Sequence, residues 1–318
     1  MKGDLDSMSL PAYKTALASY PHTQALKDGL VAPGTFRFEF EDVPVIVKAF
    51  RRMVRGLEFD ITEMAITTYV TAKAHGKRFT AIPVFPMRAF HHGAILYNVK
   101  SDIRTPKDLE GKKVGVNRGY TVTTGLWARS ILQHEYGVDL EKITWVLSGD
   151  EHVAEFQPPP NVVKAEEGRT LEEMLLSGEL AAANGILATS PDIKPLLPDA
   201  KTLGLERLRR GGLYPINHTV VVRDDLLKER PDLARDLFDA FVRAKQIYID
   251  RLKAGIAEPS PADQTFAAVM RMTGDPLPYG ITPNRRELEA IVQYSVEQGI
   301  LRTAPAVEDL FAKGTLDL

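Results

Sequence analysis

The residues best suited to acid–base chemistry are His91, His92, His218 and Glu63, which lie in or beside short apolar runs. An imidazole with an ordinary pKa of about 6.5 can gain or lose a proton near neutrality. At most one of His91 and His92 should face a site, because consecutive strand residues point to opposite sides. His218 follows Asn217 in a predicted strand, where a packed, hydrogen-bonded histidine is the alternative. Glu63 could accept a hydrogen bond from a phenolic hydroxyl, with a solvated strand residue as the alternative.

Arginines and helix starts supply the groups that could hold an anionic substrate. Arg88 offers a planar fork that matches a carboxylate, with a surface turn as the alternative. Arg118 and Thr121 precede a predicted helix, whose free N–H groups favour an anion unless they form an ordinary threonine cap. Thr67 opens another predicted helix in the same way, and His22 lies on a predicted strand-to-helix loop. The predicted substrate-binding residues are Arg88, Arg118, Gly119, Tyr120, Thr121, Thr67, Thr68, Tyr69 and His22.

Several kinds of catalytic site are excluded by the residues that the sequence lacks. Without cysteine, the chain cannot form disulfides, thiolate nucleophiles, zinc ribbons or iron–sulfur clusters. The sequence has no His-Glu-x-x-His pattern, so we predict no metal site. It also lacks the glycine-rich phosphate loops and the Gly-x-Ser-x-Gly nucleophile elbow.

The composition is typical of a soluble globular protein, with 44% hydrophobic and 26% charged residues among 318. A net charge of −2 argues against a dedicated binder of nucleic acid or of an anionic membrane. The first 27 residues contain no apolar signal-peptide core, so the prediction is a cytoplasmic protein. Met8 as the natural start, and a leader removed beforehand, are alternatives to this prediction. The sequence leaves the oligomeric state open, a homo-oligomer included.

Short apolar runs alternate with amphipathic stretches, a pattern that indicates an α/β protein. Residues 1–100 and 215–318 are predicted to form lobe one, with lobe two, residues 101–214, inserted between them. Crossovers near 97–101 and 214–222 would join the lobes and form a cleft with a hinge. The predicted strands are 35–43, 59–66, 79–85, 93–99, 143–147, 181–186 and 217–222. The predicted helices include 69–75, 121–136, 171–180 and 231–252.

Several stretches of the chain resemble one known family. IRTPKDLEGKKVGV, residues 103–116, is similar to the start of lobe two in periplasmic-binding-protein-like domains of the second type. P-x-R-x-F-x-H at 86–92 and Tyr-Pro-Ile-x-His at 214–218 resemble the 4,5-dihydroxyphthalate decarboxylase family on that fold. Further similar stretches are FDITEMAITTY (59–69), VFPMRAFHHGAILYN (84–98), VGVNRGYTVTTGLWARSIL (114–132) and YPINHTVVVRDDLL (214–227). The resemblance implies a two-lobed α/β fold of the type II periplasmic-binding-protein class, with a central cleft and two hinge crossovers.

The same resemblance implies a carboxy-lyase that converts 4,5-dihydroxyphthalate, or a close analogue, to protocatechuate. Arg88 or the 118–121 segment would anchor one carboxylate, and the other would be lost as carbon dioxide from a drier position. A histidine would protonate the ring, while Glu63 or Tyr69 would orient a hydroxyl. Because a hydroxylated ring is its own electron sink, no organic cofactor is expected. A divalent ion on the catechol oxygens stays open.

Other functions on the same fold remain as alternatives. A solute-binding protein of an ABC-type uptake system would hold an aromatic or small organic carboxylate in the same cleft without turnover. A pyrimidine-synthase relative fits poorly, since those proteins depend on a cysteine-rich motif, and a menaquinone-pathway-like enzyme stays open. Ala181 stands where the resemblance leads us to expect an aspartate. This departure bears on the substrate rather than on the fold.

Overall fold

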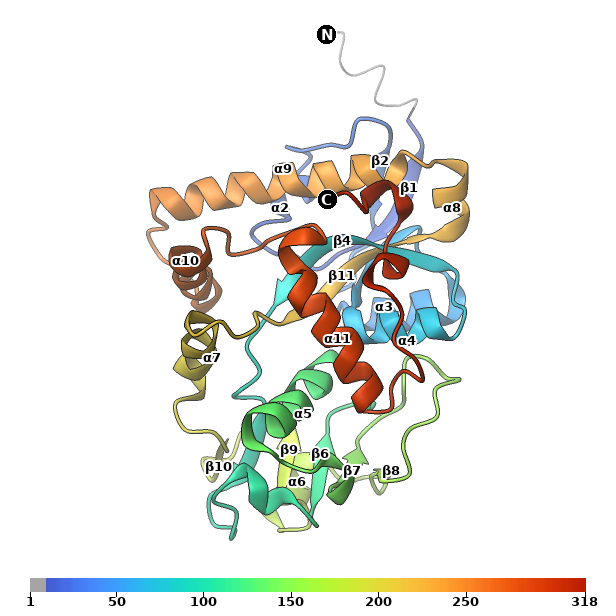
Figure 1. Ribbon diagram of the computed structural model, residues 1–318. Helices are drawn as coiled ribbons and strands as arrows, with labels where there is room; N and C mark the ends of the chain where they lie inside the picture. Colours follow the sequence, from blue (N-terminus) through green and yellow to red (C-terminus); the bar gives the residue numbers. More distant parts are fainter. Residues whose placement is uncertain (1–9) are drawn as a thin grey trace. The chain divides into compact units, whose positions relative to one another are not determined.

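The computed structural model describes residues 10–318, so Met8 lies outside the described part (Figure 1). These residues divide into two α/β units. Unit 1 comprises the chain up to Arg88 together with His218–Leu288 and Pro305–Leu318. Unit 2 comprises Ala89–Asn217 and Glu289–Ala304. The chain therefore passes from one unit to the other four times.

Unit 1 is built on a five-stranded sheet in the order β2-β1-β3-β11-β4 (Figure 1). Its strands are β1 (Ala12–Ala16), β2 (Arg37–Phe40), β3 (Ile61–Ala65), β4 (Phe79–Arg88) and β11 (Ile216–Arg223). β1 pairs in parallel with β2 and β3, whereas β11 runs antiparallel to β3. The loops after β1 and β3 and the start of β11 therefore meet at one edge of the sheet. Open α/β sheets bind their ligands at this kind of edge.

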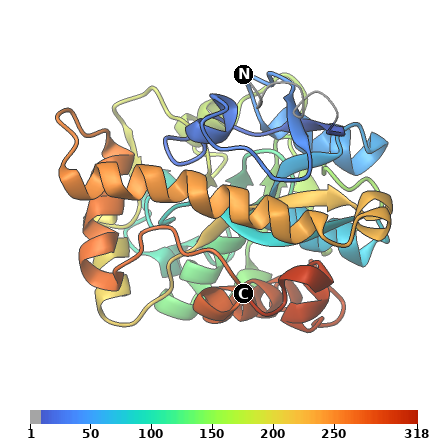
Figure 2. The same ribbon diagram turned by 90° about the horizontal axis from the view of Figure 1, so that it is seen from above.

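Amphipathic helices pack against this sheet. α3 (Val47–Gly56) contacts β3 through buried residues that recur at three- and four-residue steps. The 22-residue α9 (Leu233–Ala254) contacts β4 and α10 (Figure 2). Tyr248 of α9 and Phe266 of α10 pack in one buried cluster. The other α-helices of the unit are α2 (Gln24–Lys27), α4 (Ile66–Ala74), α8 (Asp224–Glu229) and α10 (Pro261–Thr273). Short 3₁₀ helices lie at Thr282–Asn284, Val307–Leu310 and Lys313–Thr315.

Unit 2 contains a six-stranded sheet in the order β10-β5-β9-β6-β7-β8. Its strands are β5 (Ile95–Asn98), β6 (Lys113–Val116), β7 (Thr144–Leu147), β8 (Val162–Lys164), β9 (Ala182–Asn184) and β10 (Ile193–Pro195). β6 runs parallel to β7 and β9, so the loops that follow these strands lie at one edge. Its helices are α5 (Thr123–Tyr136), α6 (Leu171–Leu176), α7 (Ala200–Arg209) and the 3₁₀ helices Pro106–Leu109 and Leu140–Lys142. α11 (Arg285–Glu297) begins in unit 1 and continues in unit 2.

Two segments group differently from the sequence-based division. β5 pairs with β9 and β10, which places residues 93–99 in unit 2 rather than in lobe one. The first passage between the units therefore falls at 88–89, not at 97–101. Residues 289–304 also belong to unit 2, where Gln298 accepts a hydrogen bond from Arg129 Nε at 2.7 Å. Non-local hydrogen bonds decide both assignments.

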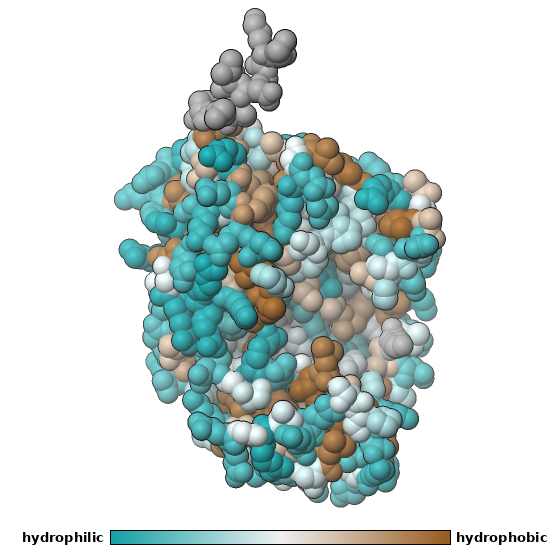
Figure 3. Space-filling model, turned by 180° about the vertical axis from the view of Figure 1, so that it is seen from behind, coloured by the Kyte–Doolittle hydropathy of each residue, from teal (hydrophilic) through white to brown (hydrophobic). Residues whose placement is uncertain are grey.

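The surface seen in Figure 3 is largely hydrophilic, with hydrophobic side chains scattered among polar ones. The exposed large hydrophobic residues are Leu30, Val45, Val163, Leu176, Leu187, Ile247 and Leu316. Every helix within residues 10–318 is too short or too polar to cross a lipid bilayer.

Candidate active site

Glu63 and His218 form a carboxylate–imidazole pair in unit 1. In the β3–β11 register, His218 lies opposite Ala65 and Val220 opposite Glu63, so the two side chains are diagonal neighbours on one face. The Nδ1–H of His218 donates to Oε1 of Glu63 at 2.5 Å. The Glu63 side chain is fully buried, whereas that of His218 is 12% exposed. Because Nδ1 is used by Glu63, Nε2 is the imidazole atom available to a ligand.

Further hydrogen bonds keep Glu63 ionised. The Tyr20 hydroxyl donates to Oε1 at 2.6 Å, and the Ala18 N–H donates to Oε2 at 2.9 Å. Burial alone would raise the pKa of the Glu63 carboxyl, but His218, Tyr20 and Ala18 together hold that pKa below its usual range. Burial, followed by the charge of Glu63, raises the pKa of Tyr20, so its hydroxyl stays protonated and donating. Glu63 is therefore a buried negative charge in direct contact with the imidazole of His218.

His22 lies beside this pair, on the loop between β1 and α2. Its ring stacks on Tyr20, with centroids 5.2 Å apart and an interplanar angle of 9°. Nε2–H donates to the Pro86 carbonyl at 2.9 Å, while Nδ1 is buried without a hydrogen-bond partner among residues 10–318. Burial lowers the pKa of His22 to about 4. The ring is therefore neutral near pH 7 and presents an unused lone pair.

His91 lies in unit 2 and is also a buried, neutral histidine. Nε2–H donates to Oδ1 of Asn217 at 3.1 Å, and the residue is 5% exposed. Burial lowers the pKa of His91 to about 4. An imidazole of such low pKa holds almost no proton to give at neutral pH. His218 is better arranged than His91 to donate a proton, because its imidazole is paired with an ionised carboxylate.

His22 and His91 are expected to make the protein less stable in mild acid. Their folded-state pKa values of about 4 lie below the ordinary value of about 6.5, so the unfolded chain takes up protons first as pH falls. The stability that each contributes is therefore present above pH 6.5 and is lost between pH 6.5 and 4. The loss amounts to about 3 kcal/mol per residue.

Urea unfolding at pH 7 and pH 5 measures this effect in wild-type protein and in the His22→Gln and His91→Gln variants. Each variant is expected to lose less free energy of unfolding than wild type over that interval. His75→Gln, at an exposed position, is the control and should behave as wild type. Equal losses in wild type and both variants would contradict the prediction.

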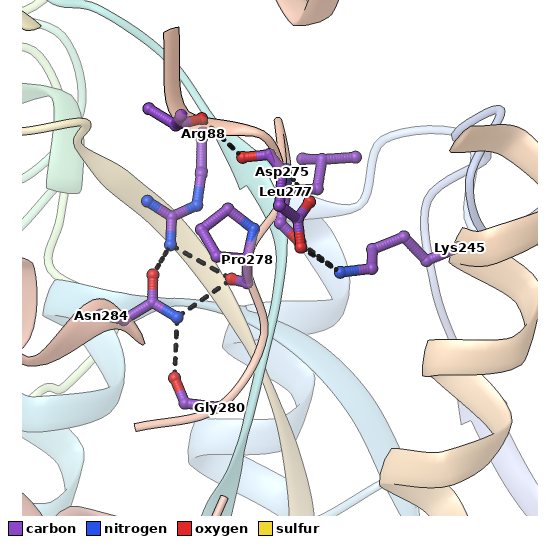
Figure 4. A network of polar contacts seen from close by, with 8 residues as sticks. Arg88, Lys245, Asp275, Leu277, Pro278, Gly280 and Asn284 are labelled. Carbon is purple, nitrogen blue, oxygen red and sulfur yellow. Dashed lines mark hydrogen bonds and ion pairs between the residues drawn. The ribbon is translucent and has the colours of Figure 1, made fainter. Parts of the chain in front are cut away.

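Arg88 ends β4 and is held by the loop that follows α10 (Figure 4). Its Nη2 donates to Oδ1 of Asn284 and, at 3.3 Å, to the carbonyl of Pro278. Lys245 steadies the same loop by donating to Asp275 at 2.8 Å. Arg88 is 6% exposed. These contacts show a buried arginine whose Nη2 bonds to two neutral oxygens and fixes the loop, so the alternative of a solvated surface turn is wrong.

Thr67, Thr68 and Tyr69 lie in the first turn of α4, as predicted; their side chains are buried, and no side chain caps this helix start within the described residues. The Tyr69 hydroxyl donates to the Leu310 carbonyl at 2.5 Å and accepts from the Ala81 N–H at 3.1 Å. Both functions of that hydroxyl are used within the core, so Tyr69 stabilises unit 1 rather than orienting a substrate. Thr68 Oγ1 is buried without a partner among the described residues.

His92 belongs to a separate group in unit 2. Its Nε2 lies 3.2 Å from Oε1 of Glu135, and Nε of Arg207 lies 3.0 Å from Oε2 of the same carboxylate. His92 is 4% exposed. Its imidazole is thus tied to an ion pair on α5 and α7.

The predicted anion position before α5 is filled by a carboxylate of the chain itself. Glu151, after β7, accepts from the N–H groups of Tyr120 and Thr121 and, at 2.6 Å, from the Thr121 hydroxyl. Gly119 lies against this carboxylate, because an added Cβ would stand 2.5 Å from Oε2. Arg118 has a φ of 71°, and burial lowers the pKa of its guanidinium. These N–H groups therefore bind a carboxylate of the chain itself.

The structure thus joins Glu63, His218 and His22 in unit 1, while His91, His92 and residues 118–121 make contacts of their own in unit 2. Among the missed residues, Tyr20 stands two positions before His22 and Asn217 stands beside His218, so sequence proximity could have indicated them. Nothing in the sequence indicated Glu151 or Asn284. Within residues 10–318, no three histidines, aspartates or glutamates gather as metal ligands.

Comparison with known proteins identifies the class of fold. No protein-family model matches the chain. The periplasmic aliphatic sulphonate-binding protein SsuA from Escherichia coli superposes with a TM-score of 0.51, covering 98% of this chain and 100% of that protein at 11% identity. The desulfurization enzyme DSZB superposes with a TM-score of 0.55, covering 96% and 98% of the two chains at 13% identity. The chain is therefore an α/β protein of the periplasmic-binding-protein fold, which both a binding protein and an enzyme adopt.

Sequence similarity identifies the family within this fold. The 4,5-dihydroxyphthalate decarboxylase of Comamonas testosteroni is 31% identical over 286 residues, which cover 84% of this chain and 86% of that protein. The chain belongs to the 4,5-dihydroxyphthalate decarboxylase family. Both the family and the fold class inferred from the sequence are confirmed.

Proposed function

We propose that this chain decarboxylates 4,5-dihydroxyphthalate, or a close analogue, to protocatechuate. The observation that carries the proposal is the Glu63–His218 pair, an ionised buried carboxylate holding an imidazole that is partly exposed. Membership in a family named for this decarboxylation supplies the substrate class. A role in the breakdown of aromatic compounds follows from the same proposal.

The chemistry requires one proton and needs no organic cofactor. A hydroxyl para to the departing carboxylate releases its proton and pushes electron density toward the ring carbon that carries the carboxylate. That carbon takes up a proton, the bond to the carboxylate breaks, and its electron pair restores the aromatic ring. The hydroxyl then regains its proton. Overall, a dicarboxylate and one proton become carbon dioxide and a monocarboxylate.

Two histidines and a glutamate of unit 1 serve these steps. His218 delivers the proton from Nε2, since Glu63 holds its Nδ1 and orients the ring. Glu63 is a positioning residue, and Tyr20 fixes it from the other side. His22 accepts the hydrogen bond of the ring hydroxyl at Nδ1, the buried nitrogen without a partner in the described part of the chain.

An assay of purified protein with 4,5-dihydroxyphthalate tests the proposal. We expect carbon dioxide and protocatechuate to appear in equal amounts, with and without a chelator, and the substrate to raise the thermal midpoint. Stabilisation without product would contradict the proposal and would support a solute-binding protein instead. Loss of turnover in chelator would show that the reaction also needs a divalent ion.

A further inference from the structure

Unit 2 contains a cavity of about 350 Å³ that none of the residues assigned to the reaction lines. Its walls come from α5, the end of α7 with the loop that follows, and α11. All of its lining residues belong to unit 2. Its volume falls in the range of about 300–1,000 Å³ typical of small-molecule sites.

One wall of the cavity is aromatic. Tyr294 stacks on His134, with ring centroids 4.6 Å apart and an interplanar angle of 27°. Trp127 meets Tyr294 edge-on at 5.9 Å and is fixed by an Nε1–H bond of 2.9 Å to the Ile216 carbonyl. These rings are held in place before any ligand arrives. Such a wall favours a flat aromatic ring, which can stack or pack edge-to-face against it.

The charges of the lining favour a monoanion. Arg207 and Arg210 contribute two positive charges and Glu135 one negative charge, which leaves one positive charge when the histidines are neutral. Arg207 is paired with Glu135 at 3.0 Å. The exposed Arg210 guanidinium has no ion-pair partner within residues 10–318. Arg210 can therefore hold a ligand carboxylate through its planar fork.

His92 adds a hydrogen-bonding group to the same cavity. With Nε2–H donating to the Glu135 carboxylate, Nδ1 is the remaining hydrogen-bonding nitrogen of the ring. Nδ1 is buried and has no hydrogen-bond partner in the described chain. An unsatisfied buried acceptor is costly, and a hydroxyl from a ligand would satisfy it.

We propose that this cavity binds a hydroxylated aromatic monocarboxylate. The ring packs against Trp127 and Tyr294, the carboxylate bonds to Arg210, and a ring hydroxyl donates to Nδ1 of His92. Protocatechuate, the product of the proposed reaction, has this chemistry. That link to the reaction rests on the proposed function, whereas the binding itself rests on the cavity.

Calorimetric titration of the full chain with 3,4-dihydroxybenzoate tests the site. Arg210→Ala is expected to weaken binding about tenfold or more, because a charge-assisted hydrogen bond is lost. Arg209→Ala is the matched control, since Arg209 is exposed on the same helix end and does not line the cavity. Catechol should bind equally to wild type and Arg210→Ala, and benzoate equally to wild type and His92→Ala.

Two outcomes would overturn the proposal. The first is wild-type affinity for 3,4-dihydroxybenzoate in both Arg210→Ala and His92→Ala. The second is an affinity that falls as much in Arg209→Ala as in Arg210→Ala. Either result would place the ligand outside this cavity. Thermal midpoints of all variants show whether each is folded, and Arg210→Ala should keep the wild-type value because the side chain is exposed. The titration uses a compound that is not turned over. A protein without decarboxylase activity can therefore still pass this test, and an active one can fail it.

Discussion

Replacing His218 with glutamine is expected to lower kcat for 4,5-dihydroxyphthalate by about 10²–10⁴-fold, the usual contribution of a general acid. Glutamine can still donate a hydrogen bond toward Glu63, but it cannot deliver a proton to a ring carbon. KM should change only slightly, because the substrate loses a proton donor and not its binding contacts. Steady-state kinetics that follow protocatechuate release measure both parameters.

Two further variants show whether the effect belongs to the Glu63–His218 pair. Glu63→Asp should retain more activity than Glu63→Gln, because it keeps the negative charge beside the imidazole. His75→Ala, at an exposed position outside the pair, should have wild-type kinetics. Wild-type kcat in His218→Gln would remove His218 from the reaction.

Replacing Arg129 with alanine is expected to cost about 3–5 kcal/mol of unfolding free energy, the usual loss when one partner of a buried charged network is removed. Arg129 is fully buried in unit 2. Nε donates to Gln298 at 2.7 Å, Nη2 donates to the Tyr120 carbonyl at 2.8 Å, and the guanidinium lies 3.8 Å from the Tyr120 ring centroid. Alanine would leave a cavity and unpaired polar atoms at both partners. Urea unfolding measures the loss.

A double substitution separates the polar loss from the lost volume. Arg129→Met with Gln298→Leu removes both ends of one buried hydrogen bond and fills the space, so it should be more stable than Arg129→Ala. Arg209→Ala, at an exposed position, should change the unfolding free energy by about 0.5 kcal/mol or less. An Arg129→Ala variant as stable as Arg209→Ala would contradict the assigned role.

Regular elements with strong hydrophobic periodicity could be predicted closely from the sequence. The stretch 59–66 corresponds to β3, and 231–252 corresponds to α9. α7 was not among the predicted helices, because residues 205–212 showed only a basic segment that ends in glycines. The helix forms around Gly204, where an added Cβ would stand 2.4 Å from the Phe90 ring. Tertiary packing, which local sequence does not show, explains this helix.

The candidate site could be predicted in its residue types but not in its pairings. Glu63 and His218 were both candidates, yet only the β3–β11 register brings them together from positions 155 apart. For Glu63 the sequence slightly favoured a solvated strand residue, whereas the structure shows the side chain fully buried. The histidine pair at 91–92 was predicted to contribute one residue to a site. Instead, both are buried, with Asn217 and Glu135 as separate partners.

The anion position predicted at residues 118–121 shows a second kind of information that the sequence does not provide, namely which group of the chain occupies it. Free N–H groups before a helix favour a carboxylate whatever its source. The sequence of 118–121 predicts that preference, but it does not show that the loop after β7 brings Glu151 to the same place. Only the parallel pairing of β6 and β7 makes the two loops neighbours.

The interleaved path of the chain has a consequence for its synthesis on the ribosome. β11 lies between β3 and β4, so the sheet of unit 1 stays incomplete until residues 216–223 have emerged. The buried contacts of unit 2 also stay incomplete, because Arg129 donates a hydrogen bond to Gln298, which is made 169 residues later. Domains that are continuous in sequence can fold one after the other during translation. Here neither unit can complete its sheet or its buried contacts until late in synthesis, after β11 and Gln298 have been made.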